Sequence, residues 1–298
     1  MDILTLSHVT KKFGSQQVLK DVSFSVPEHK IFGFIGKNGA GKTTTMKIIL
    51  GLLPIDQGEI LVNGTPVHYG RSVGCEIGYL PDVPEFYSFF TPAEYLNFCG
   101  EISGMAAADR KERTARLLTL TGLSGESRRI NGFSRGMKQR LGIAAALMNR
   151  PKLLICDEPT SALDPAGRKE ILDILVAAKE QTTILFSTHI LSDVERICDE
   201  IAFLHHGTIA LQGTLDEVKG MHKTSGISIE GVSPQDRALL LSVFSFGLPV
   251  NSTLLHFAGS DSQVAEVLTF IAAHQIPFQK IESLEPTLEE LFMEVTHQ

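Results

Sequence analysis

The sequence lacks any apolar run of the roughly 18 residues that a membrane-spanning helix needs. Its longest apolar stretch, residues 141–148, is short and contains Gly142. The N-terminal sequence MDILTLSHVTKK also lacks the pattern of a signal peptide. We therefore expect a cytoplasmic protein that reaches a membrane only through a partner, peripherally on its inner face.

Cysteine is scarce, and its spacing argues against a disulfide framework. The four cysteines never form a CxxC pair, and each lies in or beside apolar sequence: Cys75, Cys99, Cys156 and Cys198. This favours buried, reduced thiols over disulfides or a metal site. The ten histidines show no metal-binding spacing such as HExxH. Neither residue type predicts a zinc centre.

An excess of positive charge is also missing. The net charge is −7, so no general attraction to nucleic acid is expected, and we predict no nucleic-acid partner. The charge is uneven, however, because nine basic and only two acidic residues lie within residues 110–140. That segment is either a solvated helical face or a docking surface, and both interpretations remain open.

Buried strands that alternate with helices predict a layered α/β fold. Residues 31–35, 152–156 and 183–186 are apolar on both faces, as central strands of a parallel sheet are. Shorter strands are predicted at 3–9, 22–26, 58–62 and 75–80, and a hairpin at 201–211. Helices are expected from about 42 to 53 and from 165 onward.

Two further segments have their own composition. Residues 85–150 predict an all-helical block, which opens with the capping box Thr91-Pro-Ala-Glu94. A boundary near residue 220 separates a large domain, 1–220, from a small C-terminal α+β domain, 221–298. The last helix of that small domain is expected at about 287–295.

The segment 36–43 matches G-x-x-x-x-G-K-[ST], directly after a buried strand and before a helix. Its glycines allow turns that aim successive backbone N–H groups inward, and the helix N-terminus adds partial positive charge. Lys42 can reach the β- and γ-phosphates of a nucleotide, and the Thr43 hydroxyl can bind Mg²⁺. The predicted ATP-binding residues are Gly36, Lys37, Asn38, Gly39, Ala40, Gly41, Lys42, Thr43 and Thr44.

Two carboxylates, Asp157 and Glu158, follow the buried strand at 152–156. The carboxyl ends of parallel strands are where ligands bind in open α/β sheets. Asp157 is therefore predicted to hold Mg²⁺, and Glu158 to act as the general base on the attacking water. By themselves these residues would more often form a solvated acidic turn. The phosphate-loop match shifts the interpretation towards catalysis, although a kinase or a GTPase is still possible.

Three more segments narrow the choice: FSRGMKQR at 133–140, SALD at 161–164, and His189 at the end of the strand FSTH. With the phosphate loop and the acidic strand end, they resemble the nucleotide-binding subunits of ABC transporters over residues 2–215. The resemblance implies a P-loop NTPase core with an antiparallel β subdomain and an inserted helical subdomain. The segment 284–292 further resembles the ending of multidrug or bacitracin-type exporter subunits.

The resemblance assigns roles residue by residue. Phe13 resembles the aromatic that stacks on adenine, with a core Phe as the rival interpretation. His189 resembles the γ-phosphate sensor, and a structural histidine is its alternative. Asp164 resembles the residue that touches the opposing subunit, although it could serve only as a helix cap. The signature that contacts ATP of the other subunit is matched by Ser134, Arg135, Gly136 and Met137.

Three positions depart from the family pattern. Arg135 and Met137 replace the usual Gly and Gln of Leu-Ser-Gly-Gly-Gln, and Asp82 stands where a Gln usually links Mg²⁺ to the membrane domain. Asp82 keeps an oxygen ligand and adds a negative charge, so we expect it to coordinate Mg²⁺ through water.

The resemblance predicts an ATP-hydrolysing motor that forms a homodimer or heterodimer and drives a separate membrane-spanning permease subunit, with export favoured. The cofactors would be ATP and Mg²⁺. Two alternatives remain: a soluble ABC-type ATPase that acts on ribosomes or DNA, and an ATP-binding regulatory protein that does not hydrolyse.

Overall fold

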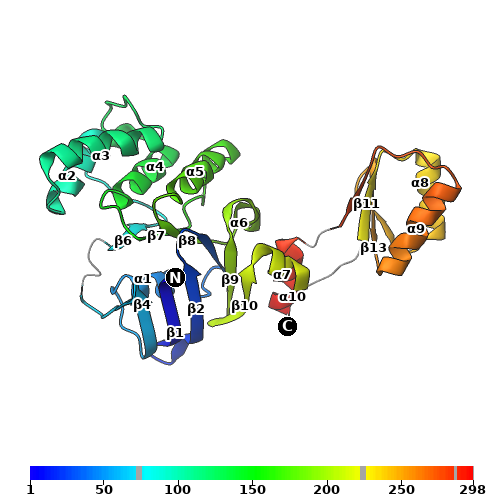
Figure 1. Cartoon of the computed structure of the whole chain (residues 1–298), viewed down its shortest axis with the longest axis horizontal. Helices are drawn as coiled ribbons and strands as arrows, with labels where there is room; N and C mark the ends of the chain where they lie inside the picture. Colours follow the sequence, from blue (N-terminus) through cyan, green and yellow to red (C-terminus); the bar gives the residue numbers. More distant parts are fainter. Residues whose placement is uncertain (72–75, 222–225, 285–286, 298) are drawn as a thin grey trace. The chain divides into compact units, whose positions relative to one another are not determined.

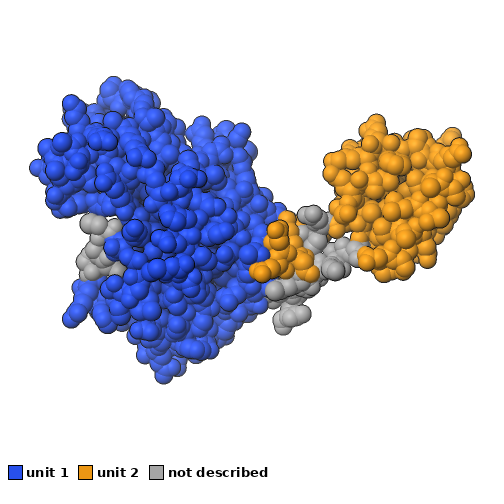
Figure 2. Space-filling model, viewed as in Figure 1, with its two compact units in different colours: residues 1–215 blue, residues 216–298 orange. Residues whose placement is uncertain are grey.

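The computed structural model describes residues 1–71, 76–221, 226–284 and 287–297. It divides into two compact units, Met1–Leu215 and Asp216–Gln298, which Figure 2 shows in different colours. The boundary predicted after residue 220 falls inside α7 (Leu215–Met221), a helix that the sequence did not predict. None of the helices described is long and apolar enough to cross a membrane.

A ten-stranded sheet forms the framework of the first unit, in the order β5-β4-β1-β2-β10-β9-β3-β8-β7-β6. Its half from β9 to β6 is parallel, and three of these strands are completely buried because apolar residues occupy both faces. The parallel strands are β3 (Ile31–Ile35), β6 (Ile77–Leu80), β7 (Leu153–Asp157), β8 (Thr183–Thr188) and β9 (Glu200–His205). The predicted buried strands are confirmed.

The other half of this sheet is mainly antiparallel and makes the expected β subdomain. Alternating buried residues such as Leu4, Leu6 and Val22 point into its core. Its strands are β1 (Asp2–Phe13), β2 (Gln16–Pro27), β4 (Gln57–Val62), β5 (Thr65–Pro66) and β10 (Thr208–Thr214). The hairpin predicted around residues 206–207 is the antiparallel β9–β10 pair.

The helical block lies beyond the parallel half of the sheet, where Figure 1 shows it in cyan and green. It contains α2 (Pro92–Ile102), α3 (Ala107–Leu120) and α4 (Arg135–Ala146). The Thr91–Glu94 capping box is present in full and fixes the start of α2. Three other helices connect strands: α1 (Lys42–Ile49), α5 (Pro165–Ala178) and α6 (Leu191–Ile197). The sequence did not predict α6, which is only two turns long.

The second unit is a small α+β domain with a four-stranded antiparallel sheet in the order β12-β13-β11-β14. Two helices, α8 (Pro234–Val243) and α9 (Asp261–Ala273), cover one face of that sheet (Figure 1). Ile229, Leu255 and Phe257 form its core with Val267 of α9. The strands are β11 (Gly226–Glu230), β12 (Gly247–Pro249), β13 (Leu254–Ala258) and β14 (Lys280–Ser283), and the final helix is α10 (Leu288–His297).

Candidate nucleotide site

The phosphate loop turns from β3 into α1 through backbone angles that glycine favours. Gly39 has φ of 82° and Gly41 has φ of 113°, both in the left-handed region. A Cβ at Gly36 would lie 2.7 Å from the carbonyl oxygen of Leu204, so no larger residue fits there. Lys42 opens α1 with a buried side chain, and its Nζ donates to the carbonyl oxygen of Gly36 at 2.7 Å.

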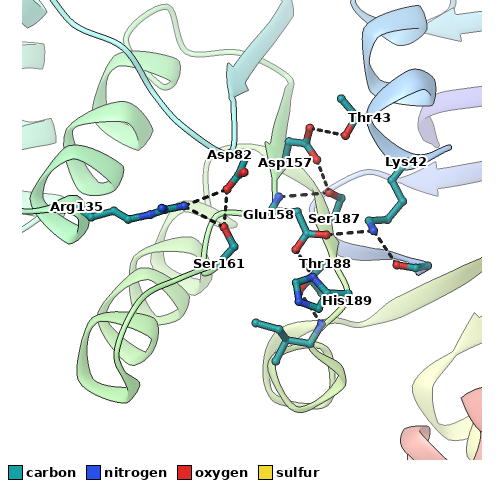
Figure 3. Close-up of polar contacts among 12 residues, drawn as sticks. Lys42, Thr43, Asp82, Arg135, Asp157, Glu158, Ser161, Ser187, Thr188 and His189 are labelled. Atoms are coloured by element: carbon teal, nitrogen blue, oxygen red, sulfur yellow. Dashed lines mark hydrogen bonds and ion pairs between the residues drawn. The ribbon is translucent and has the colours of Figure 1, made fainter. Parts of the chain in front are cut away.

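Asp157 lies at the end of β7, where its two oxygens receive hydrogen bonds from two different elements (Figure 3). The Thr43 hydroxyl of α1 donates to one oxygen at 3.0 Å, and the Ser187 hydroxyl of β8 donates to the other at 2.8 Å. Asp157 and Ser187 are register partners in the parallel β7–β8 pair. Thr43 and Asp157, two of the three residues that were predicted to bind Mg²⁺, are thus in direct contact.

Glu158 is held between two basic side chains, as Figure 3 shows. One carboxylate oxygen lies 3.1 Å from Lys42 Nζ, and the other lies 2.8 Å from Nδ1 of His189. The side chain of Glu158 is mostly buried, whereas that of His189 is about half exposed. Glu158 has φ of 50°, an uncommon conformation for a residue with a Cβ, and it turns the chain sharply after β7. The predicted base and the predicted phosphate sensor are therefore neighbours.

Lys42, Asp157 and Glu158 border one cleft with a volume of about 420 Å³. The residues that line it are Phe13, Val18, Lys37, Asn38, Gly39, Gly41, Lys42, Thr43, Thr44, Asp82, Asp157 and Glu158. Phe13 is 46% exposed, so the alternative that it is a core residue is wrong. Lys11 Nζ lies 5.3 Å from the centre of its ring. An exposed aromatic ring at the mouth of a phosphate-binding cleft is suited to stack on a base.

The carboxylates make one side of this cleft negative. Burial raises the pKa of the Tyr79 hydroxyl on β6 to about 12, and the charges of Asp157 and Asp82 contribute to the increase. Oxygen ligands of this kind suit Mg²⁺, which is typically bound by one or two carboxylates together with substrate phosphates. Among the residues described, no group of three or more His, Cys, Asp or Glu could hold a metal by itself. The oxygen donors Thr43, Asp82 and Asp157 line the cleft, so this donor set fits a Mg²⁺ ion that a nucleotide also binds.

Asp82 is bound by three side chains from other segments. Arg135 Nη2 lies 3.3 Å from Asp82 Oδ1, and the Ser161 hydroxyl donates to the same oxygen at 2.5 Å (Figure 3). Arg135 Nη2 also donates to the Ser161 hydroxyl at 3.3 Å, and the buried Gln139 amide donates to the carbonyl oxygen of Asp82 at 2.6 Å. Two of the three departures from the family pattern, Asp82 and Arg135, thus contact each other within one chain.

The remaining signature residues are not part of the cleft lining in the described chain. Ser134 caps α4 by accepting a hydrogen bond from the backbone N–H of Met137 at 3.2 Å. A Cβ at Gly136, in the first turn of α4, would meet only a side-chain carbon of Leu163, at 4.0 Å. Asp164 caps α5 by accepting from Gly167 N–H at 3.0 Å and is exposed. Contacts of these residues with a second subunit stay predictions.

Sequence reasoning missed Ser187, Ser161 and Gln139 as parts of the site. Ser187 had a usable signal, because it immediately precedes Thr188 and His189 at the end of a buried strand beside Asp157. Ser161 and Gln139 lie in the segments 161–164 and 133–140 that the resemblance singled out. No local pattern pairs either residue with Asp82, since these contacts span 79 and 57 positions of the chain.

The family model for ABC transporters matches residues 19–161, and the model for the C-terminal domain of DrrA1-3-like ATP-binding proteins matches residues 213–296. The chain is 33% identical to the linearmycin resistance ATP-binding protein LnrL of Bacillus subtilis, over 99% of this chain and 98% of LnrL. The chain belongs to the ABC transporter ATP-binding family. It is also 38% identical to the bacitracin transport ATP-binding protein BcrA of Bacillus licheniformis, over 73% of this chain and 71% of BcrA.

Solved ABC cassettes share the fold. The structure of an ATP-binding subunit of an ABC transporter superimposes with a TM-score of 0.64 at 33% identity, covering 74% of this chain and 92% of that one. A dimeric cassette bound to ADP and phosphate superimposes with a TM-score of 0.62, covering 71% and 98%, and its 24% identity supports the fold alone. The ABC cassette and its DrrA-like extension therefore account for both units of the chain.

Proposed function

We propose that this chain hydrolyses ATP as the motor subunit of an ABC transporter whose permease is a separate membrane-spanning chain. The observation that carries the proposal is the convergence of Lys42, Asp157 and Glu158 on one cleft, with His189 2.8 Å from Glu158. A phosphate-binding lysine, a magnesium-binding carboxylate and a general base are the parts that phosphoryl transfer to water needs.

Each residue has a defined task in this proposal. The backbone N–H groups of the loop and Lys42 bind the β- and γ-phosphates of ATP. Because Lys42 is paired with Glu158, phosphates that attract Lys42 loosen that ion pair and leave Glu158 free to accept a proton from water. His189, 2.8 Å from Glu158, holds that carboxylate in place and contacts the γ-phosphate. Phe13 stacks on the adenine.

Thr43 and Asp157 would hold Mg²⁺, with Asp82 acting through water. The ion, when bound, neutralises charge on the β- and γ-phosphate oxygens.

The signature acts across a dimer in this proposal. Ser134 and Gly136 are at the N-terminus of α4, which attracts phosphate, but the cleft lining lacks them. A head-to-tail arrangement of two such chains, or of this chain and a relative, would place each signature on the ATP of the other. Asp164 would then contact the opposing subunit.

The helical block offers a surface for the permease. Tyr87 is 56% exposed and Phe89 is 58% exposed, just after the loop that carries Asp82. Their rings belong to an aromatic cluster that also includes Phe90 and Phe98. Large exposed aromatic residues are typical of protein interfaces. A permease bound there would keep the chain on the cytoplasmic face of the membrane. The linearmycin resistance role of LnrL and the bacitracin transport role of BcrA favour export.

The substitution Glu158→Gln tests hydrolysis. It removes the proton acceptor but keeps the shape of the side chain, so turnover should fall by about 100-fold or more. ATP binding should persist, and the variant should form a stable ATP-bound dimer detectable by size-exclusion chromatography. The exposed Glu180→Gln is the matched control and should turn over normally. Normal turnover by Glu158→Gln would exclude Glu158 as the base.

Isolation of the tagged chain from detergent-solubilised cells tests the partnership. The proposal expects a membrane polypeptide to co-purify. Ribosomes or DNA in its place would favour the soluble ATPase alternative.

A further inference from the structure

A second cavity in the first unit lies away from the nucleotide cleft and has a volume of about 280 Å³. Its walls come from α3, from the segment between α4 and β7, and from the segment between α5 and β8. The lining residues are Arg113, Arg116, Leu147, Arg150, Pro151, Gln181 and Thr182. Because β7 and β8 begin just after this cavity, it lies at the amino ends of the parallel strands. The nucleotide cleft lies at their carboxyl ends.

The buried lining residues form the floor of this cavity, and the exposed ones form its rim. Arg113 is only 4% exposed and Thr182 only 2% exposed. Arg116 and Arg150 are exposed. Three guanidinium groups thus line one small space, and one of them is almost completely removed from solvent.

The buried guanidinium has only neutral partners. Arg113 Nη2 donates to the carbonyl oxygen of Leu147 at 2.8 Å, and Nη1 donates to the side-chain oxygen of Gln181 at 3.1 Å. Its Nε is buried and has no hydrogen-bond partner. Burial lowers the pKa of Arg113, and the positive charges of Arg150 and Arg116 lower it further. A buried cation without a counter-ion is costly, so this group gains from an anion nearby.

None of the three arginines has an ion pair with a carboxylate in the part of the chain that is described. Five other arginines differ in this respect, because each forms an ion pair with Asp or Glu: Arg128, Arg135, Arg140, Arg168 and Arg196. The cavity therefore concentrates positive charge that the protein itself leaves uncompensated. Guanidinium groups present planar pairs of N–H donors that match the oxygens of phosphate.

We propose that Arg113, Arg116 and Arg150 form a binding site for a phosphate group, separate from the nucleotide cleft. The cavity is smaller than the roughly 300 to 1,000 Å³ of pockets that enclose drug-sized ligands, which fits a single small anionic group. Three positive charges favour a phosphate, with up to two negative charges, over a single carboxylate. The phosphate belongs either to a soluble compound or to the head group of a lipid. This site does not depend on the proposed ATPase activity.

The test measures binding of inorganic phosphate to the full-length protein by equilibrium dialysis at constant ionic strength, so that general screening stays the same. The double variant Arg116→Gln/Arg150→Gln changes only exposed side chains and should keep its fold. We expect its phosphate affinity at this site to fall by about tenfold or more, since two charge-assisted contacts are lost. Arg113 is left unchanged because its burial makes unfolding a risk.

The matched control is Lys111→Gln/Lys169→Gln, which removes the same charge from exposed positions on α3 and α5 outside the cavity. It should bind phosphate as the wild type does. Phosphate binding that is lost in the variant Lys42→Ala belongs to the phosphate loop. Binding at the second site should be unchanged in this variant. Equal affinities of the arginine variant and the lysine control would exclude free phosphate as the ligand of this site.

A sedimentation assay with vesicles distinguishes the two sources. Phosphatidylcholine vesicles with phosphatidic acid should retain the wild type but not the arginine variant if a lipid head group is the ligand, whereas pure phosphatidylcholine should retain neither. Arginine-dependent binding of free phosphate without vesicle retention identifies a soluble ligand. If neither phosphate binding nor vesicle retention depends on Arg116 and Arg150, the site does not exist.

Discussion

The two halves of the candidate ATP site differ in how they are built. Lys42, Asp157 and Glu158 are mostly buried, and each is held by contacts with neighbouring strands or with the phosphate loop. Asp82 and Arg135 are about half exposed, and their contact is a 3.3 Å ion pair at the surface. The buried half is preorganised within one chain. The exposed half has room to change partners, which the proposed contact with a second subunit would require.

The largest effect should come from the buried half, through Lys42→Ala. Removal of the ammonium group that faces the phosphates leaves their charge unpaired and should weaken Mg-ATP binding by about 100-fold. Isothermal titration calorimetry measures this, with the exposed Lys47→Ala of the same helix as control. If Lys42→Ala bound Mg-ATP as tightly as the control, the nucleotide site itself would be in the wrong place.

Ser187→Ala tests whether the buried half depends on its supporting contacts. The Ser187 hydroxyl donates to Asp157 at 2.8 Å, and its oxygen accepts from the backbone N–H of Glu158 at 3.3 Å. Loss of a hydrogen bond to a charged group costs about 1.5 kcal/mol, so kcat should fall by about tenfold. Steady-state ATPase kinetics measure this. An unchanged kcat would mean that the β7–β8 register alone positions Asp157.

Phe13→Ala tests the mouth of the cleft, where the ring is 46% exposed. An aromatic stacking contact is worth about 1 kcal/mol, so the KM for ATP should rise by about fivefold. The value of kcat should stay the same, because the adenine is far from the reacting phosphate. Phe13→Tyr keeps the stacking surface and should behave as the wild type. A rise in KM for both variants would point to a role other than stacking.

The smallest effect should come from the exposed pair. Asp82→Gln and Arg135→Gly each leave one charge uncompensated beside the cleft, whereas the double variant removes both. If the two single losses were independent, their product would give the kcat/KM of the double variant. We expect the measured kcat/KM of the double variant to be about threefold higher than that product, as for a surface ion pair. Strict additivity would show that the 3.3 Å contact has no energetic role.

Most of the nucleotide site could be predicted because its parts are local in the sequence. The phosphate loop is eight consecutive residues after a buried strand, and Asp157 and Glu158 end another such strand. The predicted bounds of the three buried strands lie close to the observed ones, because a short continuous run of apolar residues is compatible with few structures other than a buried strand. The ends of helices were less certain. The helix predicted from about 42 to 53 ends at Ile49, because Gly51 follows in the left-handed region with φ of 69°.

The sequence by itself determined the family, the layered fold and the candidate phosphate loop, because the spacing of glycines and the period of apolar residues involve only a few neighbouring positions. Only the tertiary structure decided which charged groups lie together. Lys42 and His189 both contact Glu158, and Arg135 contacts Asp82. Three arginines line one cavity. Such encounters join residues that the chain separates by tens of positions. The order of strands and the packing of helices bring these residues together, and no local sequence pattern predicts that order.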